Sequence, residues 1–326
     1  MGAGPEISIV LPAHNEAGNI SAIAAAIAQQ MALIGPYEII FVDDGSSDGT
    51  LAAIRAAARD PAVRYVSFTR NFGHQAALRA GLRHASGRAV IVMDADFEHP
   101  PELIPQLIAA WRGGAKIAAT RRDDDATVSA GKRLSSRLYY RMLDAIGDVR
   151  IEPGSADFML LDRAVVDVVN ALEDQDIFLR GLVRWLGFPL VTIPYRRGTR
   201  THGESSFSMR RMVELALTGI AAHSVRPLRF AIYLALGFAL LSLLFIVYAI
   251  VSFLFVQHTV AGWSSLIAIV AILGAAQLLV LGIIGEYVGR ILRETRKRPS
   301  YIVAETEAER ADAAKPSERA DPVPPL

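Results

Sequence analysis

The sequence predicts an α/β domain with a mostly parallel sheet, followed by two membrane-spanning helices near the C-terminus. The first observation is a regular alternation of short apolar segments with segments of helical apolar spacing over residues 7–120. Repeated βα units of this kind form parallel sheets with helices on both faces. The second observation is a pair of long uncharged stretches after residue 229.

The first five expected elements alternate strand and helix. Ile7–Leu11 is a short apolar run that fits a buried strand, and Asn19–Leu33 has the spacing of a helix with one apolar face. Tyr37–Val42 is a second strand, because it is apolar and ends in a loop of Asp, Gly and Ser. Thr50–Arg59 is helical by its spacing, and Val63–Phe68 is a β-branched and aromatic run that predicts a strand.

The alternation continues through four more elements. His74–Ser86 is expected to be a helix that is closed by Gly87. Ala89–Met93 is an uninterrupted apolar run and predicts a buried strand. Pro101–Arg112 follows as a helix, and Lys116–Thr120 is the fifth expected strand.

Two carboxylates leave the end of the strand Ala89–Met93. In extended backbone, positions two apart point to the same side, so Asp94 and Asp96 are expected side by side, and Glu98 joins them if the extension persists. Like charges this close repel each other, and Mg²⁺ or Mn²⁺ is a hard cation that prefers oxygen ligands. A lone Asp-x-Asp is more often a solvated pair in a loop. The loop after Asp43 is expected at the same edge of the sheet, where ligands of such sheets bind.

Composition excludes several classes of function. The chain of 326 residues has a net charge of +1, which gives no indication of nucleic-acid binding. It contains no cysteine, which excludes disulfides, thiol catalysis and cysteine-based metal sites. The first βα turn lacks G-x-G-x-x-G, so binding of a nicotinamide dinucleotide is disfavoured.

Two uncharged stretches predict a transmembrane hairpin. Phe230–Val256 and Gly262–Gly285 each exceed the roughly 20 residues that cross a bilayer as a helix. Lys and Arg flank the outer ends of both stretches, and the short connection between them has none. The positive-inside rule therefore places the main domain and both termini in the cytoplasm, with the hairpin in the inner (plasma) membrane. A buried pair of core helices is the alternative.

Four regions are expected along the chain. Residues 1–207 form the main domain, 208–228 amphipathic juxtamembrane helices, 229–289 the two transmembrane helices, and 290–326 a basic tail that is disordered after Val303. A further basic stretch, Lys132–Ile146, either lies on an anionic membrane surface or packs against the domain. His74 is expected to be structural, and Trp185 to be a packing residue.

Four motifs occur in an order that is typical of one family. They are Leu11-Pro12-Ala13-His14-Asn15-Glu16, Val42-Asp43-Asp44-Gly45-Ser46, Arg70-Asn71-Phe72-Gly73-His74-Gln75 and Met93-Asp94-Ala95-Asp96. The chain resembles the inverting family 2 glycosyltransferases, and within them the polyprenyl-phosphate glycosyltransferases. Phe178-Leu179-Arg180-Gly181-Leu182 and Gly203-Glu204-Ser205 add to the likeness. The resemblance covers residues 7–298 and implies the GT-A fold, a Rossmann-like α/β domain.

The resemblance also implies roles for individual residues. The nucleotide would be bound by Pro12, Asn15, Glu16, Asp44, Asp94 and Ala95, with Asp44 at the base and Asp94 on the ribose side. Asp96 with Glu98 would bind the Mg²⁺ or Mn²⁺ that bridges the diphosphate. Catalytic roles would fall to Asp94, Asp96 and Asp157, the last at the position usually assigned to the acceptor-side base. The diphosphate or lipid phosphate would be contacted by Arg121, Lys132, Arg133, Arg137, Arg200 and Ser205.

The implied reaction moves a sugar from a nucleotide-diphosphate sugar, expected to be a UDP-sugar, to polyprenyl (undecaprenyl) phosphate. A phosphate monoester has a second pKa of about 6 and is already nucleophilic at pH 7. Asp157 is therefore expected to orient the acceptor or a basic residue at least as readily as to remove a proton. The other implied partners are the bilayer and further copies of the chain, in a dimer or tetramer packed through small residues such as Gly274.

Three alternative functions stay open at this point. A processive polysaccharide synthase shares the fold, but has Gln where this chain has Gly181 before Arg184-Trp185. A transferase with a soluble acceptor leaves the hairpin without a purpose. The third alternative is a membrane-anchored nucleotide-sugar-binding protein without activity. The sugar is not identified: glucose, N-acetylhexosamine, aminoarabinose and mannose donors all fit.

Overall fold

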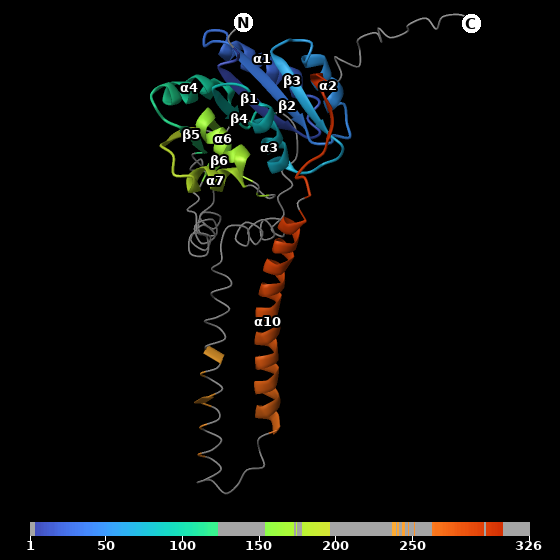
Figure 1. Ribbon diagram of the computed structural model, residues 1–326, viewed down its shortest axis with the longest axis vertical. Coiled ribbons are helices and arrows are strands. Elements are labelled where there is room, and N and C mark those ends of the chain that lie inside the picture. Colours follow the sequence, from blue (N-terminus) through green and yellow to red (C-terminus); the bar gives the residue numbers. More distant parts are fainter. Residues whose placement is uncertain are drawn as a thin grey trace, which may run out of the picture. The chain divides into compact units, whose positions relative to one another are not determined.

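The computed structural model describes residues 4–122, 154–172, 174, 178–195, 237, 238, 240, 243, 244, 247, 251, 263–296 and 298–308. The chain divides into two compact units. The first comprises Met1–Ser136, Ile151–Ser206 and Pro299–Leu326, and the second comprises Arg137–Arg150 and Phe207–Arg298. The sheet lies in the first unit and helix α10 in the second (Figure 1).

The described part of the first unit contains one eight-stranded sheet in the order β7-β5-β6-β4-β1-β2-β3-β8. Its strands are β1 (Ile7–Ala13), β2 (Tyr37–Asp43), β3 (Val63–Phe68), β4 (Ala89–Val92), β5 (Ile117–Arg122), β6 (Ser155–Asp162), β7 (Leu190–Tyr195) and β8 (Val303–Thr306). The five strands predicted from the sequence are all present, with ends that differ by at most two residues.

The sheet is mostly parallel, as predicted, but it is mixed: six of its eight strands run in one direction, and β6 and β8 run in the other. The pairs β1–β2, β1–β4, β2–β3 and β5–β7 are parallel, whereas β6 runs antiparallel to both β4 and β5, and β8 antiparallel to β3. Strands β6 and β8 lie beyond the βα repeats that the sequence displays. Antiparallel strands do not need the helical crossover that such a repeat supplies, so the repeat could not predict their direction.

Short helices separate the strands. They are α1 (Ile20–Met31), α2 (Thr50–Ala57), α3 (His74–His84), the 3₁₀ turn η1 (Pro101–Leu103) with α4 (Ile104–Arg112), α6 (Arg163–Ala171) and α7 (Leu179–Trp185). The four helices predicted between residues 19 and 112 are confirmed, although the fourth begins as a 3₁₀ turn at Pro101. Proline fits such a first turn because its missing N–H has no partner to lose there.

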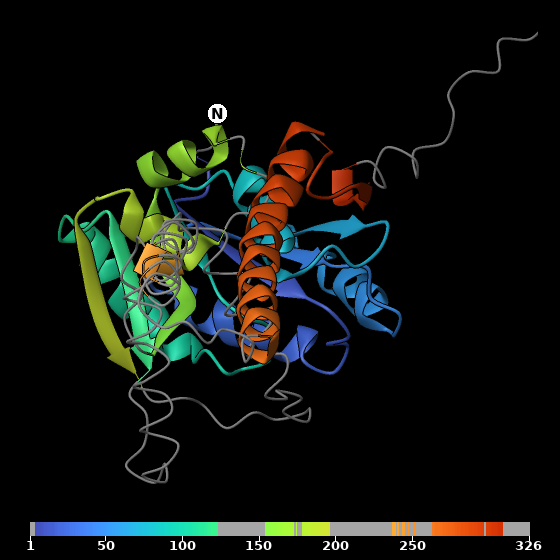
Figure 2. The ribbon, with the colours of Figure 1, turned by 90° about the horizontal axis from the view of Figure 1, so that it is seen from below.

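Apolar side chains form two layers of core, one on each face of the sheet. Strand β1 alternates: Ile7, Ile9 and Leu11 belong to one layer, and Val10 to the other. Helices α1, α2 and α4 cover the first layer, and α3, α6 and α7 cover the second. Both helix layers can be followed in Figures 1 and 2. Burial on both faces explains why these strands are continuous apolar runs in the sequence.

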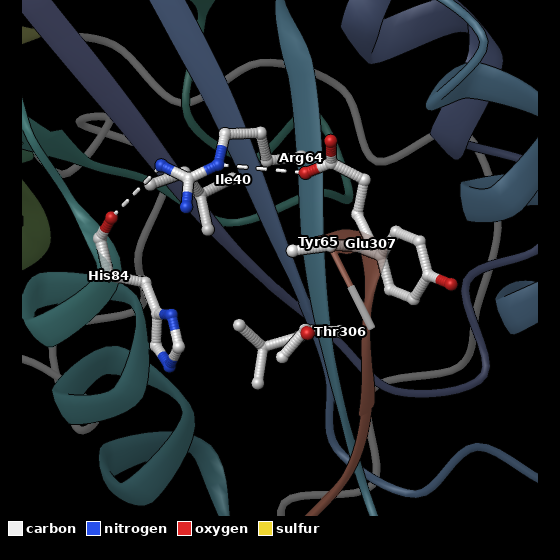
Figure 3. Close-up of a pocket in the computed structure, with 8 residues that line it drawn as sticks. Ile40, Arg64, Tyr65, His84, Thr306 and Glu307 are labelled. Carbon is white, nitrogen blue, oxygen red and sulfur yellow. Dashed lines mark hydrogen bonds and ion pairs between the residues drawn. The ribbon is translucent and has the colours of Figure 1, made fainter. Parts of the chain in front are cut away.

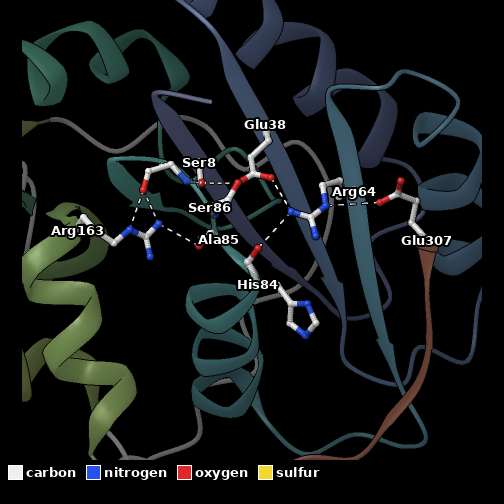
Figure 4. A network of polar contacts seen from close by, with 9 residues as sticks. Ser8, Glu38, Arg64, His84, Ala85, Ser86, Arg163 and Glu307 are labelled. Carbon is white, nitrogen blue, oxygen red and sulfur yellow. Dashed lines mark hydrogen bonds and ion pairs between the residues drawn. The ribbon is translucent and has the colours of Figure 1, made fainter. Parts of the chain in front are cut away.

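A buried carboxylate ties together the amino-terminal ends of the strands (Figure 4). Glu38 of β2 accepts hydrogen bonds from the Ser8 hydroxyl at 2.6 Å, the Ser86 N–H at 2.7 Å and Arg64 Nη1 at 2.7 Å. Burial opposes its charge, but these donors together lower the pKa of Glu38 below its ordinary value. The network fixes the end of the sheet opposite the loops described below.

The C-terminal segment adds an edge strand. The sequence predicts disorder after Val303, but residues 303–306 form β8 and pair with β3. For these residues the prediction is wrong, because a charged, alanine-rich composition does not reveal pairing with a strand more than 230 residues earlier in the chain. Residues 309–326 lie outside the described residues.

Helix α10 (Trp263–Thr295) is long and apolar enough to cross a membrane. Its candidate span is Ile272–Gly289, with a mean hydropathy of 1.7. It overlaps the second predicted span and continues further toward the C-terminus. Of the first predicted span, Phe230–Val256, the structure describes only residues 237, 238, 240, 243, 244, 247 and 251, all of them helical, so the hairpin stays a prediction.

Candidate active site

Three loops meet at the carboxyl ends of β1, β2 and β4. Because β1 pairs in parallel with both β2 and β4, the chain leaves all three strands at one edge of the sheet. The Asp44 N–H donates to the Ala13 carbonyl at 2.9 Å, which ties the second loop to the end of β1. The Met93 N–H donates to the Val10 carbonyl at 3.1 Å, which ties the start of the third loop, after β4, to strand β1. This edge is the one at which the sequence predicts a ligand.

Asn15 connects the first loop to the second. Its backbone is left-handed, with φ of 58°, a conformation that asparagine adopts more readily than most residues. Its N–H donates to Ser46 Oγ at 3.1 Å, and its Oδ1 accepts from the Ser47 N–H at 2.9 Å. Pro12 is buried within β1, whereas Asn15 is exposed and Glu16 half-buried. His14, Asn15 and Glu16 are thus the members of this motif that have surface to offer a ligand.

Glu16 joins the starts of helices α1 and α2. Its Oε2 accepts from Asn19 Nδ2 at 2.6 Å, one residue before α1. Its N–H donates to the hydroxyl of Thr50, the first residue of α2, at 2.7 Å. These bonds orient the loop so that the Glu16 carboxylate stands at the predicted ligand edge.

Asp44 holds the loop that follows β3. Asp44 is 3% exposed, and its carboxylate accepts hydrogen bonds from the Phe72 N–H at 2.6 Å and the Gly73 N–H at 2.9 Å. Burial raises the pKa of Asp44, although both hydrogen bonds favour the charged form. Gly45 permits the close approach of the two loops, since its φ is 61° and a Cβ there would lie 2.2 Å from the Arg70 backbone. The contact of Asp44 with a base stays a prediction.

Asp94 and Asp96 follow β4, but the extended backbone does not persist to Glu98. The chain turns at Phe97, which has φ of 63°, and the Glu98 N–H donates back to Asp96 Oδ1 at 3.0 Å. Asp96 is 8% exposed, and the side chain of Asp94 is 34% exposed. Across the described ranges, no group of three or more His, Asp or Glu side chains forms a metal-binding cluster. A metal would therefore need oxygen ligands from the substrate as well.

Asp157 of β6 forms an ion pair with Arg180 of α7. Arg180 Nε donates to Oδ1 at 3.0 Å and Nη2 donates to Oδ2 at 2.7 Å, which is the two-bond geometry that guanidinium and carboxylate favour. Burial disfavours the charge of Asp157, but His74 and Arg180 outweigh it and hold the pKa of this carboxyl well below its usual range. Such a carboxylate is a weak base at neutral pH. The geometry fits the expectation that Asp157 orients a basic residue.

His74, the first residue of α3, lies between two of the predicted catalytic carboxylates. Its Nε2 is 3.6 Å from Asp157 Oδ2 and 3.8 Å from Asp94 Oδ1. Burial favours neutral imidazole, yet the two carboxylates prevail and raise the pKa of His74. The expectation of a merely structural histidine misses this placement. His74 and Arg180 bring positive charge to an edge that is otherwise rich in carboxylates.

His99 supports the backbone of Asp94. Its Nδ1 accepts the Asp94 N–H at 2.9 Å, so its proton belongs on Nε2. The ring is stacked on Phe158 with centroids 5.2 Å apart, and burial lowers the pKa of His99. Tyr195 packs edge-on against the same ring, and burial raises the pKa of Tyr195 to about 12. Both rings are therefore neutral at physiological pH.

Comparison with known proteins identifies the family to which this site belongs. The model described as Glycosyl transferase family 2 matches residues 8–169. The bactoprenol glucosyl transferase of Shigella phage SfV is 38% identical over 301 residues, which cover 91% of this chain and 98% of that protein. The chain belongs to glycosyltransferase family 2. The uncharacterized glycosyltransferase YkcC of Bacillus subtilis is 37% identical over 300 residues, or 91% of this chain and 93% of YkcC.

Solved structures are more distant from this family 2 glycosyltransferase. Glucosyl-3-phosphoglycerate synthase from Mycobacterium tuberculosis, in complex with Mn²⁺ and UDP-glucose, is 20% identical with a TM-score of 0.44. The alignment covers 67% of this chain and 77% of that one. This likeness is too remote to assign a ligand.

Most residues predicted to contact phosphate lie outside the described part of this family 2 chain. These are Lys132, Arg133, Arg137, Arg200 and Ser205. Arg121 is described: it lies near the carboxyl end of β5, half-buried, and is paired with Ser155 of β6, two residues before Asp157. Trp185 ends α7 and is 65% exposed, so the expectation that it is a packing residue is wrong. A tryptophan in a helical turn with apolar neighbours gives no sign of which face is covered.

Two site residues were not predicted to have a chemical role. Arg180 lies in the Phe178–Leu182 motif that supported the resemblance, and His74 lies in the Arg70–Gln75 motif. Both motifs could have indicated a functional position. The sequence could not show that both side chains contact the carboxylate of Asp157. Arg180 is 23 positions from Asp157 in the chain, and His74 is 83 positions from it.

Proposed function

We propose that the protein transfers a single sugar from a nucleotide-diphosphate sugar, with a UDP-sugar as the first candidate, to polyprenyl phosphate of the undecaprenyl type. The observation that carries the proposal is 38% identity along 98% of a bactoprenol glucosyl transferase, a length that includes the α10 region. That relationship makes UDP-glucose the first donor to test and a long-chain polyprenyl phosphate the first acceptor.

The proposed mechanism uses fixed cations rather than a strong base. The acceptor phosphate is already an anion at pH 7, so it needs no proton removed before it attacks the anomeric carbon. Its approach to a diphosphate is opposed by charge repulsion, which Arg180 and protonated His74 would offset. Asp157 would keep the Arg180 guanidinium in one orientation through two hydrogen bonds of 3.0 and 2.7 Å. An oriented guanidinium loses little freedom when it binds a phosphate.

Asp96 and Glu98 would hold a divalent cation in this scheme, with the substrate supplying further oxygen ligands. Mg²⁺ is commonly bound by one or two carboxylates together with substrate phosphates. The adjacent carboxylates of this loop offer that donor set, and Asp96 is kept in place by the Glu98 N–H at 3.0 Å. When bound, such an ion neutralises negative charge on the diphosphate leaving group. Asp94, supported by His99, would contact the ribose side.

We also infer a membrane location with the catalytic unit in the cytoplasm. Helix α10 supports this through its candidate span Ile272–Gly289. The arginines and lysine that follow the second uncharged stretch support the orientation. A lipid acceptor requires that the enzyme work at a bilayer surface.

The test is a transfer assay on the full chain in detergent. Radiolabelled UDP-glucose, UDP-N-acetylhexosamine, UDP-aminoarabinose and GDP-mannose are each supplied with undecaprenyl phosphate and Mn²⁺, and the lipid extract is counted and sized. A one-sugar lipid product with one donor is the expected result. A polymer would favour the processive alternative, a labelled water-soluble product would favour a soluble acceptor, and nucleotide-sugar binding without transfer would favour an inactive binding protein.

A further inference from the structure

Strand β8 pairs with β3 just before the loop that Asp44 holds. The paired positions are Val66 with Thr306, Ser67 with Glu305 and Phe68 with Val303. One residue beyond β3, the Thr69 N–H donates to the Ile302 carbonyl at 3.1 Å. The C-terminal segment thereby fixes the backbone from which residues 70–73 extend.

Aromatic rings extend this support from β8 to the loop itself. Tyr301 is stacked on Phe68 with centroids 4.9 Å apart and an interplanar angle of 14°. Phe68 meets Phe72 edge-on at 5.8 Å. The N–H of Phe72, together with that of Gly73, binds the buried carboxylate of Asp44. A continuous series of contacts therefore runs from Tyr301 to Asp44.

Charged groups hold the strand in register. Glu305 accepts from Arg55 Nε at 2.8 Å and Arg55 Nη2 at 2.7 Å, and also from the Tyr65 hydroxyl at 2.9 Å. Figure 3 shows the end of β8 beside a small pocket, where Glu307 lies 3.6 Å from Arg64 Nε. Two-bond pairs of the Arg55–Glu305 kind constrain geometry more than single ion pairs do. The attachment is thus specific to this segment.

We propose that Tyr301 and Glu305 are positioning residues for the donor site: β8 holds the 69–73 loop, and this loop holds Asp44 at the nucleotide end of the site. The proposal rests on the proposed function for the identity of the donor. Withdrawal of the loop would leave a buried carboxylate without its two N–H donors, a state that costs free energy and favours movement of Asp44. Residues 296–302 connect α10 to β8 in the chain. The segment that follows the apolar helix α10 in the sequence therefore completes the donor site.

Hydrogen exchange on the full chain in detergent tests the proposal without any substrate. In Tyr301→Ala, the amides of Phe72 and Gly73 are expected to exchange about tenfold faster, because the aromatic support of the loop is lost. Tyr301→Phe keeps the ring and is expected to exchange like the wild type. The matched control is Tyr37→Ala, which removes a half-buried tyrosine at the opposite end of the sheet and should leave these two amides unchanged.

Donor affinity provides the second readout. Tyr301→Ala and Glu305→Gln are expected to weaken UDP binding by about tenfold and to raise KM for the donor, with kcat and KM for the lipid unchanged. Unaltered exchange at Phe72 and Gly73 together with unaltered UDP affinity would overturn the proposal. If the wild type binds no nucleotide at all, the proposed function fails, whereas the exchange measurement still reports whether β8 holds the loop.

Discussion

Arg180 Nε and Nη2 donate to the two oxygens of the Asp157 carboxylate at 3.0 and 2.7 Å, while His74 Nε2 stands 3.6 Å from one of those oxygens. One buried carboxylate thus organises two cationic side chains that come from different helices. Removing its charge would release both. The Arg180–Asp157 pair is the part of the site whose geometry bears most directly on the mechanism.

Asp157→Asn should reduce kcat/KM by about a hundredfold or more, the usual effect of losing a group that organises transition-state charge. The pKa of Asp157 is held below its usual range, so the carboxylate is ionised throughout the neutral and alkaline range. If Asp157 removes no proton from the acceptor, hydroxide cannot take over its function in the variant. The pH–rate profile of the variant should therefore show no steep recovery at high pH. Strong alkaline recovery would identify Asp157 as a base. Arg180→Lys is the companion variant, and it should raise KM for the lipid because lysine cannot make the two-bond contact.

Asp96→Ala should abolish Mn²⁺-dependent binding of the donor while leaving the fold intact. The residue lies in a loop after β4, and its Oδ1 accepts the nearby Glu98 N–H, so the strands keep their own backbone hydrogen bonds when it is removed. Calorimetry of UDP-glucose binding with and without Mn²⁺ measures the effect, and the thermal transition of the variant controls for folding. Unchanged Mn²⁺-dependent affinity would exclude Asp96 as a metal ligand.

His74→Gln should alter the pH dependence of stability. The pKa of His74 is raised above its ordinary value of 6.5, so its charge stabilises the fold fully below that pH. This contribution is lost as the pH rises through the folded-state pKa. Melting temperatures measured from pH 6 to pH 9 should therefore fall more gently for the variant than for the wild type. Parallel curves would show that the two carboxylates do not stabilise the imidazolium.

Glu38→Gln should destabilise the first unit by about 2 kcal/mol, because a buried network loses its charge and one strong acceptor. The pKa of Glu38 is lowered from its ordinary value of 4.5, so the wild-type stabilisation is present above that pH and is lost as the pH falls through the folded-state pKa. Melting curves at pH 7 and pH 4 should show a difference between variant and wild type that shrinks in acid. Glu6→Gln, which disturbs the more exposed ion pair with Arg112 at 2.9 Å, is the control and should have little effect.

His258→Cys offers a clean test of membrane topology because the natural chain has no cysteine. The position lies in the short connection between the two predicted spans. An impermeant maleimide should label it from outside intact cells, whereas Ser47→Cys, in the exposed loop after β2, should be labelled only after lysis. Labelling of His258→Cys only after lysis would contradict a hairpin with its connection outside.

The elements built on periodic patterns could be predicted from the sequence, and those built on distant pairing could not. Strands β1 to β4 are buried on both faces, so strands such as Ile7–Ala13 and Ala89–Val92 can be recognised in the sequence as short apolar runs. Val303–Thr306 is a strand only because β3 presents an edge to it. The direction of β6 depends on its neighbours β4 and β5, which no local pattern encodes.

The same distinction holds in the site. Asp94, Asp96 and Asp157 could be named because short motifs contain them. The turn at Phe97 is a single dihedral choice, with φ of 63°, and it redirects Glu98 in a way that side-chain alternation cannot anticipate. Arg180 and His74 acquire their significance from one carboxylate that is remote from both in the chain.

The late position of β8 also has a consequence for biosynthesis. Strand β3 has β2 on one side and β8 on the other, and β8 is encoded after α10. Until the ribosome has made the apolar helix, β3 therefore presents an unpaired edge, the kind of edge to which other chains can add. The first unit can complete its sheet only after α10 has been synthesised. A chain that lacked β8 would be left with an open sheet edge and without the β8 support for the 69–73 loop that binds Asp44.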